Sequence, residues 1–181
     1  MYVLTVYVNP SFDDAVALHS LYKTHIENHN RNAENNTDYA DSGFDLLVPK
    51  VYKPYNCETF MPEELLIVDH QVVIKLKKSN YNSPLPFYMY ARSSLGKKKR
   101  LRLANSVGII DAGYYGNIIA VFDVLKRNSE NDPDTENALR HERLVQVCAP
   151  DLSPLKVVLE PLGNVPPVSG ERGVGGLGST G

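Results

Sequence analysis

The chain has 181 residues, 43% of them hydrophobic and 22% charged, which suits one globular domain and excludes a chain that is disordered throughout. Its 19 basic and 21 acidic side chains give a formal net charge of -2, which excludes a global basic field for binding duplex nucleic acid. Because the sequence shows neither a bilayer-spanning run of about 20 apolar residues nor a signal-peptide pattern, we expect a cytoplasmic or nuclear protein without a membrane partner.

The N-terminal 37 residues predict a strand and a helix. Met1–Val8 is rich in Val and Tyr, as strands are, and ends at an Asn-Pro turn. A helix is expected from Ser11, as N-cap, to about Asn28–Asn30, since one face then carries side chains at three- and four-residue steps. Those side chains are Phe12, Val16, His19, Tyr22 and Ile26. Asn28–Thr37 contains five asparagines and predicts a mobile loop.

From Gly43 onward, short apolar runs alternate with turn residues, which predicts an all-β domain built as a compact barrel or jelly roll. We assign residues 1–169 to this domain, with 1–37 as an N-terminal strand–helix extension. The predicted strands are Phe44–Val48, Leu65–Val68, Val72–Leu76, Phe87–Ala91, Val107–Ile110, Ile118–Leu125, Arg143–Cys148 and Lys156–Leu159.

Several segments are expected to lie outside the strands. Lys126–Arg140 is polar and predicts an exposed loop with a short helical turn near its end. Lys97–Arg100 is basic and is interpreted as a solvated loop rather than a nucleic-acid patch. Residues 170–181 hold six of the 12 glycines and predict a flexible tail. Cys57 and Cys148 lack the close spacing of a zinc site and are interpreted as reduced core thiols.

Three segments carry residues suited to an anion. Asn105–Gly116 is a short strand that leads to Asp111 and two tyrosines, which predicts a hairpin with an acid at its mouth. Ala91–Gly96 places an arginine beside two serines, and Glu171–Gly181 combines an arginine with glycines and hydroxyls. Guanidinium groups, hydroxyls and the backbone N–H groups of glycines all match phosphate oxygens. Together they predict a phosphate clamp beside an acid.

These segments resemble, in order, the five motifs of homotrimeric deoxyuridine triphosphate nucleotidohydrolases, the dUTPases. The resemblance covers about Asp41–Gly181 and implies a β-clip or jelly-roll subunit, with an added N-terminal helix, in a homotrimer whose sites draw on more than one chain. The matching segments are Asp41–Leu46, Ala91–Gly96, Gly108–Gly116, Glu142–Gln146 and Arg172–Gly181.

The resemblance implies a dUTP diphosphatase that forms dUMP and pyrophosphate, which keeps uracil out of DNA and supplies dUMP for dTMP synthesis. Asp111 is the implied general base, which activates water for attack on the α-phosphorus. Mg²⁺ is the implied cofactor and is chelated by the phosphates without a direct protein ligand, while Asp45 reaches it or the phosphates through water.

The resemblance also implies a set of substrate-binding residues. Asn105 would read the uracil edge, Tyr114 would pack under the deoxyribose, and the tail would close over the nucleotide. The full set is Arg92, Ser93, Ser94, Asn105, Gly108, Tyr114, Gln146, Arg172, Leu177, Gly178, Ser179 and Thr180. Leu177 stands where the family usually has an aromatic that stacks on uracil, which removes a stacking contribution of roughly 1 kcal/mol.

Two alternatives remain open at this point. A dCTP deaminase-type enzyme of the same fold would release ammonia from dCTP, although the complete tail and Asn105 argue against it. A non-catalytic nucleotide-binding or regulatory protein of this fold would bind dUTP without hydrolysing it. Leu177, the added N-terminal unit and the enlarged loop at Lys126–Arg140 are the features that suggest the second alternative.

Overall fold

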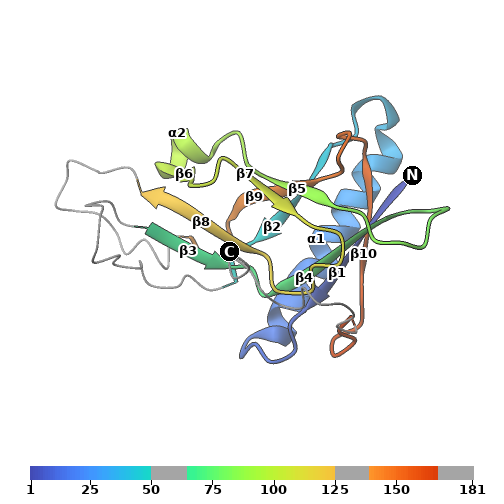
Figure 1. The fold of residues 1–181 in the computed structure, drawn as a ribbon, viewed down its shortest axis with the longest axis horizontal. Coiled ribbons are helices and arrows are strands. Elements are labelled where there is room, and N and C mark those ends of the chain that lie inside the picture. The colour runs from blue at the N-terminus through green and yellow to red at the C-terminus, as the bar shows by residue number, and fades with distance from the viewer. Residues whose placement is uncertain (50–64, 125–138, 167–181) are drawn as a thin grey trace.

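The computed structural model describes residues 1–49, 65–124 and 139–166, and within them ten strands form three sheets (Figure 1). The strand orders are β10-β1-β4, β2-β9-β5-β7 and β3-β8-β6. The strands are β1 Tyr2–Val8, β2 Gly43–Leu47, β3 Leu65–Asp69, β4 Val72–Lys78, β5 Phe87–Ala91, β6 Leu101–Leu103, β7 Val107–Ile110, β8 Ile119–Val124, β9 Arg143–Cys148 and β10 Leu155–Leu159. The helices are α1 Ala15–Asn35, the short α2 Leu95–Lys99 and a 3-10 turn at Thr37–Tyr39.

The β-rich fold with an N-terminal helix is confirmed, and every predicted strand is present within one or two residues of its expected bounds. The alternation of side chains explains this agreement, because strands buried on one face place every second residue in the core. The basic segment Lys97–Arg100 was expected to be a loop, but most of it belongs to helix α2. Leu95 is buried and anchors this helix, and Arg100 ends it with a left-handed backbone (φ 51°).

Helix α1 begins and ends later than the sequence predicts. Ser11 is not its N-cap, since the helix starts at Ala15 and no side-chain cap is formed. The buried face consists of Ala15, Leu18, Tyr22 and Ile26, whereas Val16 is 74% exposed. The loop expected at residues 28–37 is wrong: the helix continues to Asn35, and the side chains of His29 and Asn30 in its fifth turn bind the backbone of β10.

The four-stranded sheet β2-β9-β5-β7 lies between the other two sheets, with β3-β8-β6 at one end of the molecule and β10-β1-β4 with α1 at the other (Figure 1). One of its faces is buried in the core through Phe44, Met89, Val145 and Val147. The other face, called the open face below, is exposed along β7 at Val107 and Ile109, while most of its residues on β2, β9 and β5 are half-buried and Cys148 is buried. Cross-strand partners share a face, so the pairing register defines which side chains lie on the open one.

Of the two cysteines, Cys148 is buried, as expected, and Cys57 lies outside the described residues. Burial raises the pKa of the Cys148 thiol to about 11. Among the described helices, none is both long and apolar enough to cross a membrane.

Candidate functional site

One end of the open sheet face carries a charged cluster. Asp45 pairs with Gln146, which pairs in turn with Tyr90, so these three side chains lie side by side on β2, β9 and β5. The Asp45 carboxylate is held by two arginines: Oδ1 lies 2.9 Å from Arg92 Nε, and Oδ2 lies 3.4 Å from Arg143 Nη1. The Asp45 side chain is only 15% exposed, whereas those of Arg92 and Arg143 are 30% and 46% exposed, so water reaches the cluster from the arginine side.

Arg92 is fixed by its backbone as well as by its side chain. Its N–H donates to the carbonyl of Leu144 at 3.0 Å, and its Nη1 donates to the carbonyl of Arg143 at 3.3 Å. Ser93 and Ser94 follow Arg92 in the turn that leads into α2, with Ser93 exposed and Ser94 half-buried. The structure therefore brings a guanidinium and two hydroxyls to one end of β5, which is what binding of phosphate oxygens requires.

The place of Gln146 depends on Gly43, which lies on β2 two residues before Asp45, the cross-strand partner of Gln146. A Cβ added at Gly43 would lie 2.5 Å from Gln146 Oε1 and 3.0 Å from Cys148 Sγ. Any side chain at position 43 would therefore displace the amide of Gln146 from the place it occupies. The close approach explains why a glycine belongs in the motif-like segment Asp41–Leu46.

The other end of the open face is formed by the hairpin that follows β7. Asp111 is exposed and accepts a backbone hydrogen bond from Tyr114 N–H at 3.1 Å through its carbonyl. The Tyr114 hydroxyl donates to the carbonyl of Asn117 at 2.9 Å, and the ring lies where a Cβ of Gly116 would be. Burial, followed by the charge of Asp69, raises the pKa of Tyr114.

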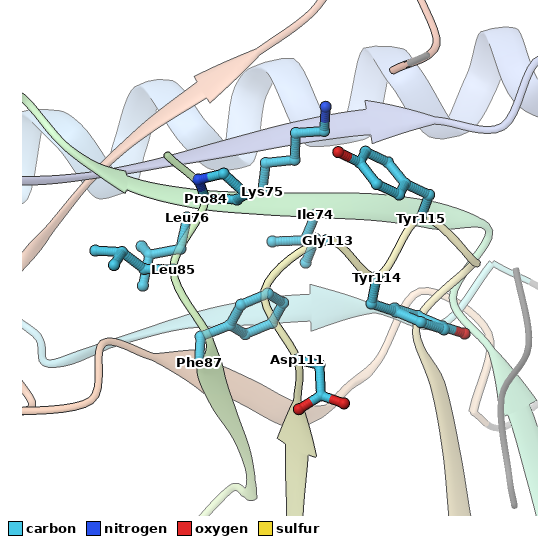
Figure 2. Close-up of a pocket in the computed structure, with 10 residues that line it drawn as sticks. All are labelled: Ile74, Lys75, Leu76, Pro84, Leu85, Phe87, Asp111, Gly113, Tyr114 and Tyr115. Atoms are coloured by element: carbon cyan, nitrogen blue, oxygen red, sulfur yellow. The ribbon is translucent and has the colours of Figure 1, made fainter. Parts of the chain in front are cut away.

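The pocket beside Asp111 is small (Figure 2). Its volume is about 10 Å³, which has room for about one water molecule and not for a nucleoside. The Lys75 ammonium in its wall lies 4.5 Å from the centre of the Tyr115 ring and points away from the Asp111 carboxylate in this view. The hairpin of one chain thus presents Asp111 outward instead of enclosing it.

The two ends of the face lie far apart within one chain. Ile110, which precedes Asp111, pairs with Phe87 at the start of β5, whereas Arg92 follows the last residue of that strand. Five residues of strand correspond to roughly 17 Å at 3.3 Å per residue. The structure therefore brings Asp45, Arg92 and Gln146 together but leaves Asp111 and Tyr114 remote from them.

The other expected site residues lie elsewhere. Asn105 is exposed in the turn between β6 and β7, and Gly108 packs against Met89, whose Cε would lie 3.0 Å from an added Cβ. The structure thus separates Asn105 from Asp111 by the length of β7. The tail residues Arg172, Leu177, Gly178, Ser179 and Thr180 lie outside the described residues, as does most of the Lys126–Arg140 segment.

Sequence reasoning missed Arg143 and His25 as neighbours of Asp45. Arg143 had a usable signal, since it begins the strand that carries Gln146 and is the only cation in that strand. His25 had none, because its contact with Asp45 joins a helix and a strand far apart in the sequence. Its Nε2 lies 3.0 Å from the Asp45 carbonyl oxygen.

The resemblance implies Mg²⁺ that is carried on phosphates, and the charged cluster can be tested for its fit to such an ion. Both Asp45 oxygens already face guanidinium groups, so this carboxylate suits water-mediated contact rather than direct coordination. Across residues 1–49, 65–124 and 139–166, no three His, Cys, Asp or Glu side chains gather as a metal-binding group.

Neither a family model nor a curated protein matches the chain. Among solved structures, the chain is similar to the dUTPase from Streptococcus mutans, with 24% sequence identity and a TM-score of 0.39 over 59% of this chain and 75% of that chain. An overlap this partial leaves function to be inferred from the residues themselves.

Proposed function

We propose that the protein is a dUTP diphosphatase with a dUTPase-like jelly-roll subunit, and that it hydrolyses dUTP to dUMP and pyrophosphate. The observation that carries this proposal is the cluster of Asp45, Arg92, Arg143 and Gln146 on the open sheet face. These residues come from three of the five motif-like segments, which are far apart in the chain and meet only through the sheet. Such convergence is expected if the segments serve one site.

In this proposal the cluster binds the phosphates. Arg92 donates to phosphate oxygens together with the hydroxyls of Ser93 and Ser94, and Asp45 holds the Arg92 guanidinium in place before the ligand arrives. Arg172, Ser179 and Thr180 add donors from the tail and exclude water on closure. Mg²⁺, when bound, neutralises charge on the phosphates.

Asp111 acts as the general base. Its carboxylate accepts a proton from the water that attacks the α-phosphorus, and a base of this kind must lie within hydrogen-bond reach of that water. Asn105 and Tyr114 select the uracil and the deoxyribose. Because roughly 17 Å of strand separates Asp111 from Arg92 in one chain, the base of each site has to come from a second chain.

The open face offers a surface for that second chain. Val107 and Ile109 are 37% and 70% exposed, and they lie on β7 on the same face as Asp45 and Gln146. Exposed apolar side chains beside a charged cluster fit an interface that surrounds a shared site. We therefore place three copies in a closed ring, each contributing its cluster to one site and its hairpin to the next.

The first experiment measures pyrophosphate release from a panel of deoxynucleoside and nucleoside triphosphates with Mg²⁺. We expect release from dUTP and not from dTTP, dCTP or UTP. Ammonia release from dCTP would instead identify a deaminase, and tight dUTP binding without hydrolysis would identify a non-catalytic protein.

A second experiment tests sharing of sites between chains. Arg92→Ala and Asp111→Asn variants are each expected to be nearly inactive, whereas a mixture unfolded and refolded together regains roughly a quarter of the wild-type activity, since a quarter of its sites contain both intact residues. A mixture as inactive as its components would place both residues in the same chain's site. Refolding each variant alone is the control.

A further inference from the structure

Side chains of helix α1 occupy the free edge of strand β2. This strand is the outermost of the sheet β2-β9-β5-β7, so one side of its backbone faces no other strand of that sheet. On that side, His25 Nε2 lies 3.0 Å from the carbonyl oxygen of Asp45, and the N–H of Leu47 donates to the hydroxyl of Tyr22 at 3.0 Å. Two helix side chains thus take the place of a neighbouring strand.

The same helix also packs around the side chain that precedes Asp45. The ring of His25 stacks on Phe44 with centroids 4.7 Å apart and an interplanar angle of 29°, and His29 meets that ring edge-on at 5.3 Å. Phe44 is fully buried. Because successive side chains of a strand point to opposite faces, holding Phe44 in the core directs the Asp45 carboxylate to the open face.

Asp45 is therefore held in two ways: its backbone by a hydrogen bond to His25, and its side chain by two ion pairs. His25 holds the Asp45 carbonyl, while the Asp45 carboxylate holds Arg92 at 2.9 Å and Arg143 at 3.4 Å. A shift of β2 along or away from the helix would move the carboxylate with it. Since the pair with Arg92 is short, a small shift changes its geometry.

We propose that His25 is a positioning residue for the charged cluster, and that it acts on Arg92 through the backbone and carboxylate of Asp45. The positioning role rests on the proposed function of that cluster. It gives the N-terminal helix, which the motif-like segments do not include, a part in nucleotide binding.

The protonation state of the His25 ring suits a lasting hydrogen bond to Asp45. A carbonyl oxygen can only accept, so Nε2 carries the hydrogen and Nδ1 is the bare nitrogen. Burial lowers the pKa of His25, the Asp45 hydrogen bond and charge oppose that shift, and Arg143 and His29 add to it. The ring is therefore neutral at neutral pH, with Nε2–H as its single donor.

The test compares three substitutions at His25 with one at His29. His25→Leu keeps apolar contact and removes the donor, His25→Gln places an amide N–H near the position of Nε2, and His25→Asn retains a donor that is too short to reach. His29→Leu is the matched control, because His29 lies on the same helix, contacts the same Phe44 ring and bonds a carbonyl, that of Leu155 at 3.2 Å.

The first readout is the Nε–H resonance of Arg92 in a ¹⁵N-correlated NMR spectrum, which reports its bond to Asp45 without any catalysis. We expect His25→Leu and His25→Asn to shift or broaden this signal, and His25→Gln and His29→Leu to leave it in place. An unchanged signal in folded His25→Leu and His25→Asn protein overturns the proposal. So does an equal change in His29→Leu, which would mean that any damage to the helix has the same effect.

The second readout is the dissociation constant for the non-hydrolysable α,β-imido analogue of dUTP. We expect it to rise about threefold to tenfold in His25→Leu, the range of one hydrogen bond, and to return toward the wild-type value in His25→Gln. A wild-type protein that does not bind the analogue would defeat the proposed function while the Arg92 signal still tests the positioning role. Should His25→Leu not fold, the His25→Asn and His25→Gln pair decides both readouts.

Discussion

The two ends of the open sheet face differ in how complete they are. At the charged end, Asp45 is 15% exposed and is already paired with Arg92 and Arg143 within one chain. At the hairpin end, Asp111 is exposed beside a pocket of about 10 Å³. Under the proposed function, this difference means that a single chain builds the proposed phosphate-binding part of the site and presents Asp111, the proposed base, to another chain.

The largest expected effect comes from a substitution that changes the hairpin end alone. Replacing Asp111 with Asn removes the proposed base and preserves the shape of the side chain, so we expect turnover of dUTP to fall at least about a hundredfold while nucleotide binding stays within about twofold. Steady-state kinetics and calorimetric titration with the α,β-imido analogue measure the two quantities. Unchanged turnover would remove Asp111 from the mechanism.

The second prediction concerns the pH dependence of stability, through a buried histidine that bonds the end of β2. His70 is completely buried and its Nδ1–H donates to the carbonyl of Leu47, the last residue of β2, at 2.9 Å, while Nε2 has no hydrogen-bond partner among the described residues. Burial lowers the pKa of His70 from 6.5 to about 4. The unfolded chain therefore binds a proton between these pH values that the folded chain does not.

Stability is then fully present above pH 6.5 and is lost as the pH falls toward 4. Between pH 7 and pH 5 we expect the free energy of unfolding to drop by about 2 kcal/mol from this group. His70→Asn keeps a donor for Leu47 without titrating in this range, and denaturant titrations should show a smaller drop. The control is His141→Asn, since His141 is exposed. If His141→Asn reduces the drop in the free energy of unfolding as much as His70→Asn does, the drop does not come from His70.

The third effect concerns the surface between the two ends. Ile109→Asp places a charge on the exposed apolar face of β7, so we expect the proposed trimer to dissociate at least tenfold more readily in sedimentation experiments, with the proposed activity lost in parallel. Val158→Asp changes another exposed apolar side chain, which is 37% exposed against 70% for Ile109 and lies on β10, and it should leave assembly unchanged. Equal effects of the two variants would argue against β7 as the interface.

The smallest expected effect tests whether Gly43 serves to accommodate Gln146 at the charged end. Gly43→Ala places a methyl group where the Gln146 amide lies, and we expect the dissociation constant for the nucleotide analogue to rise about threefold to tenfold. If the glycine acts only by accommodating Gln146, adding Gly43→Ala to Gln146→Ala protein has no further effect. Additive losses would show that Gly43 has a separate role.

Much of the fold could be predicted because it depends on local patterns. The strands follow from alternation and from flanking turn residues, and Phe87–Ala91, Val107–Ile110 and Arg143–Cys148 have the expected bounds. The end of α1 could not be predicted in this way. Its asparagine-rich last turns have weak helix propensity, but Asn30 both donates to and accepts from the backbone of Val157, at 2.8 and 3.0 Å.

The sequence by itself determined the residue types of the candidate site, because phosphate binding and proton abstraction need guanidinium groups, hydroxyls and a carboxylate at recognisable spacings. Only the tertiary structure decided that Asp45 meets Arg143, that His25 holds the strand beneath them, and that Asp111 lies at the opposite end of β5. The reason is physical: chemistry belongs to single side chains, whereas distance between them depends on strand pairing across many residues.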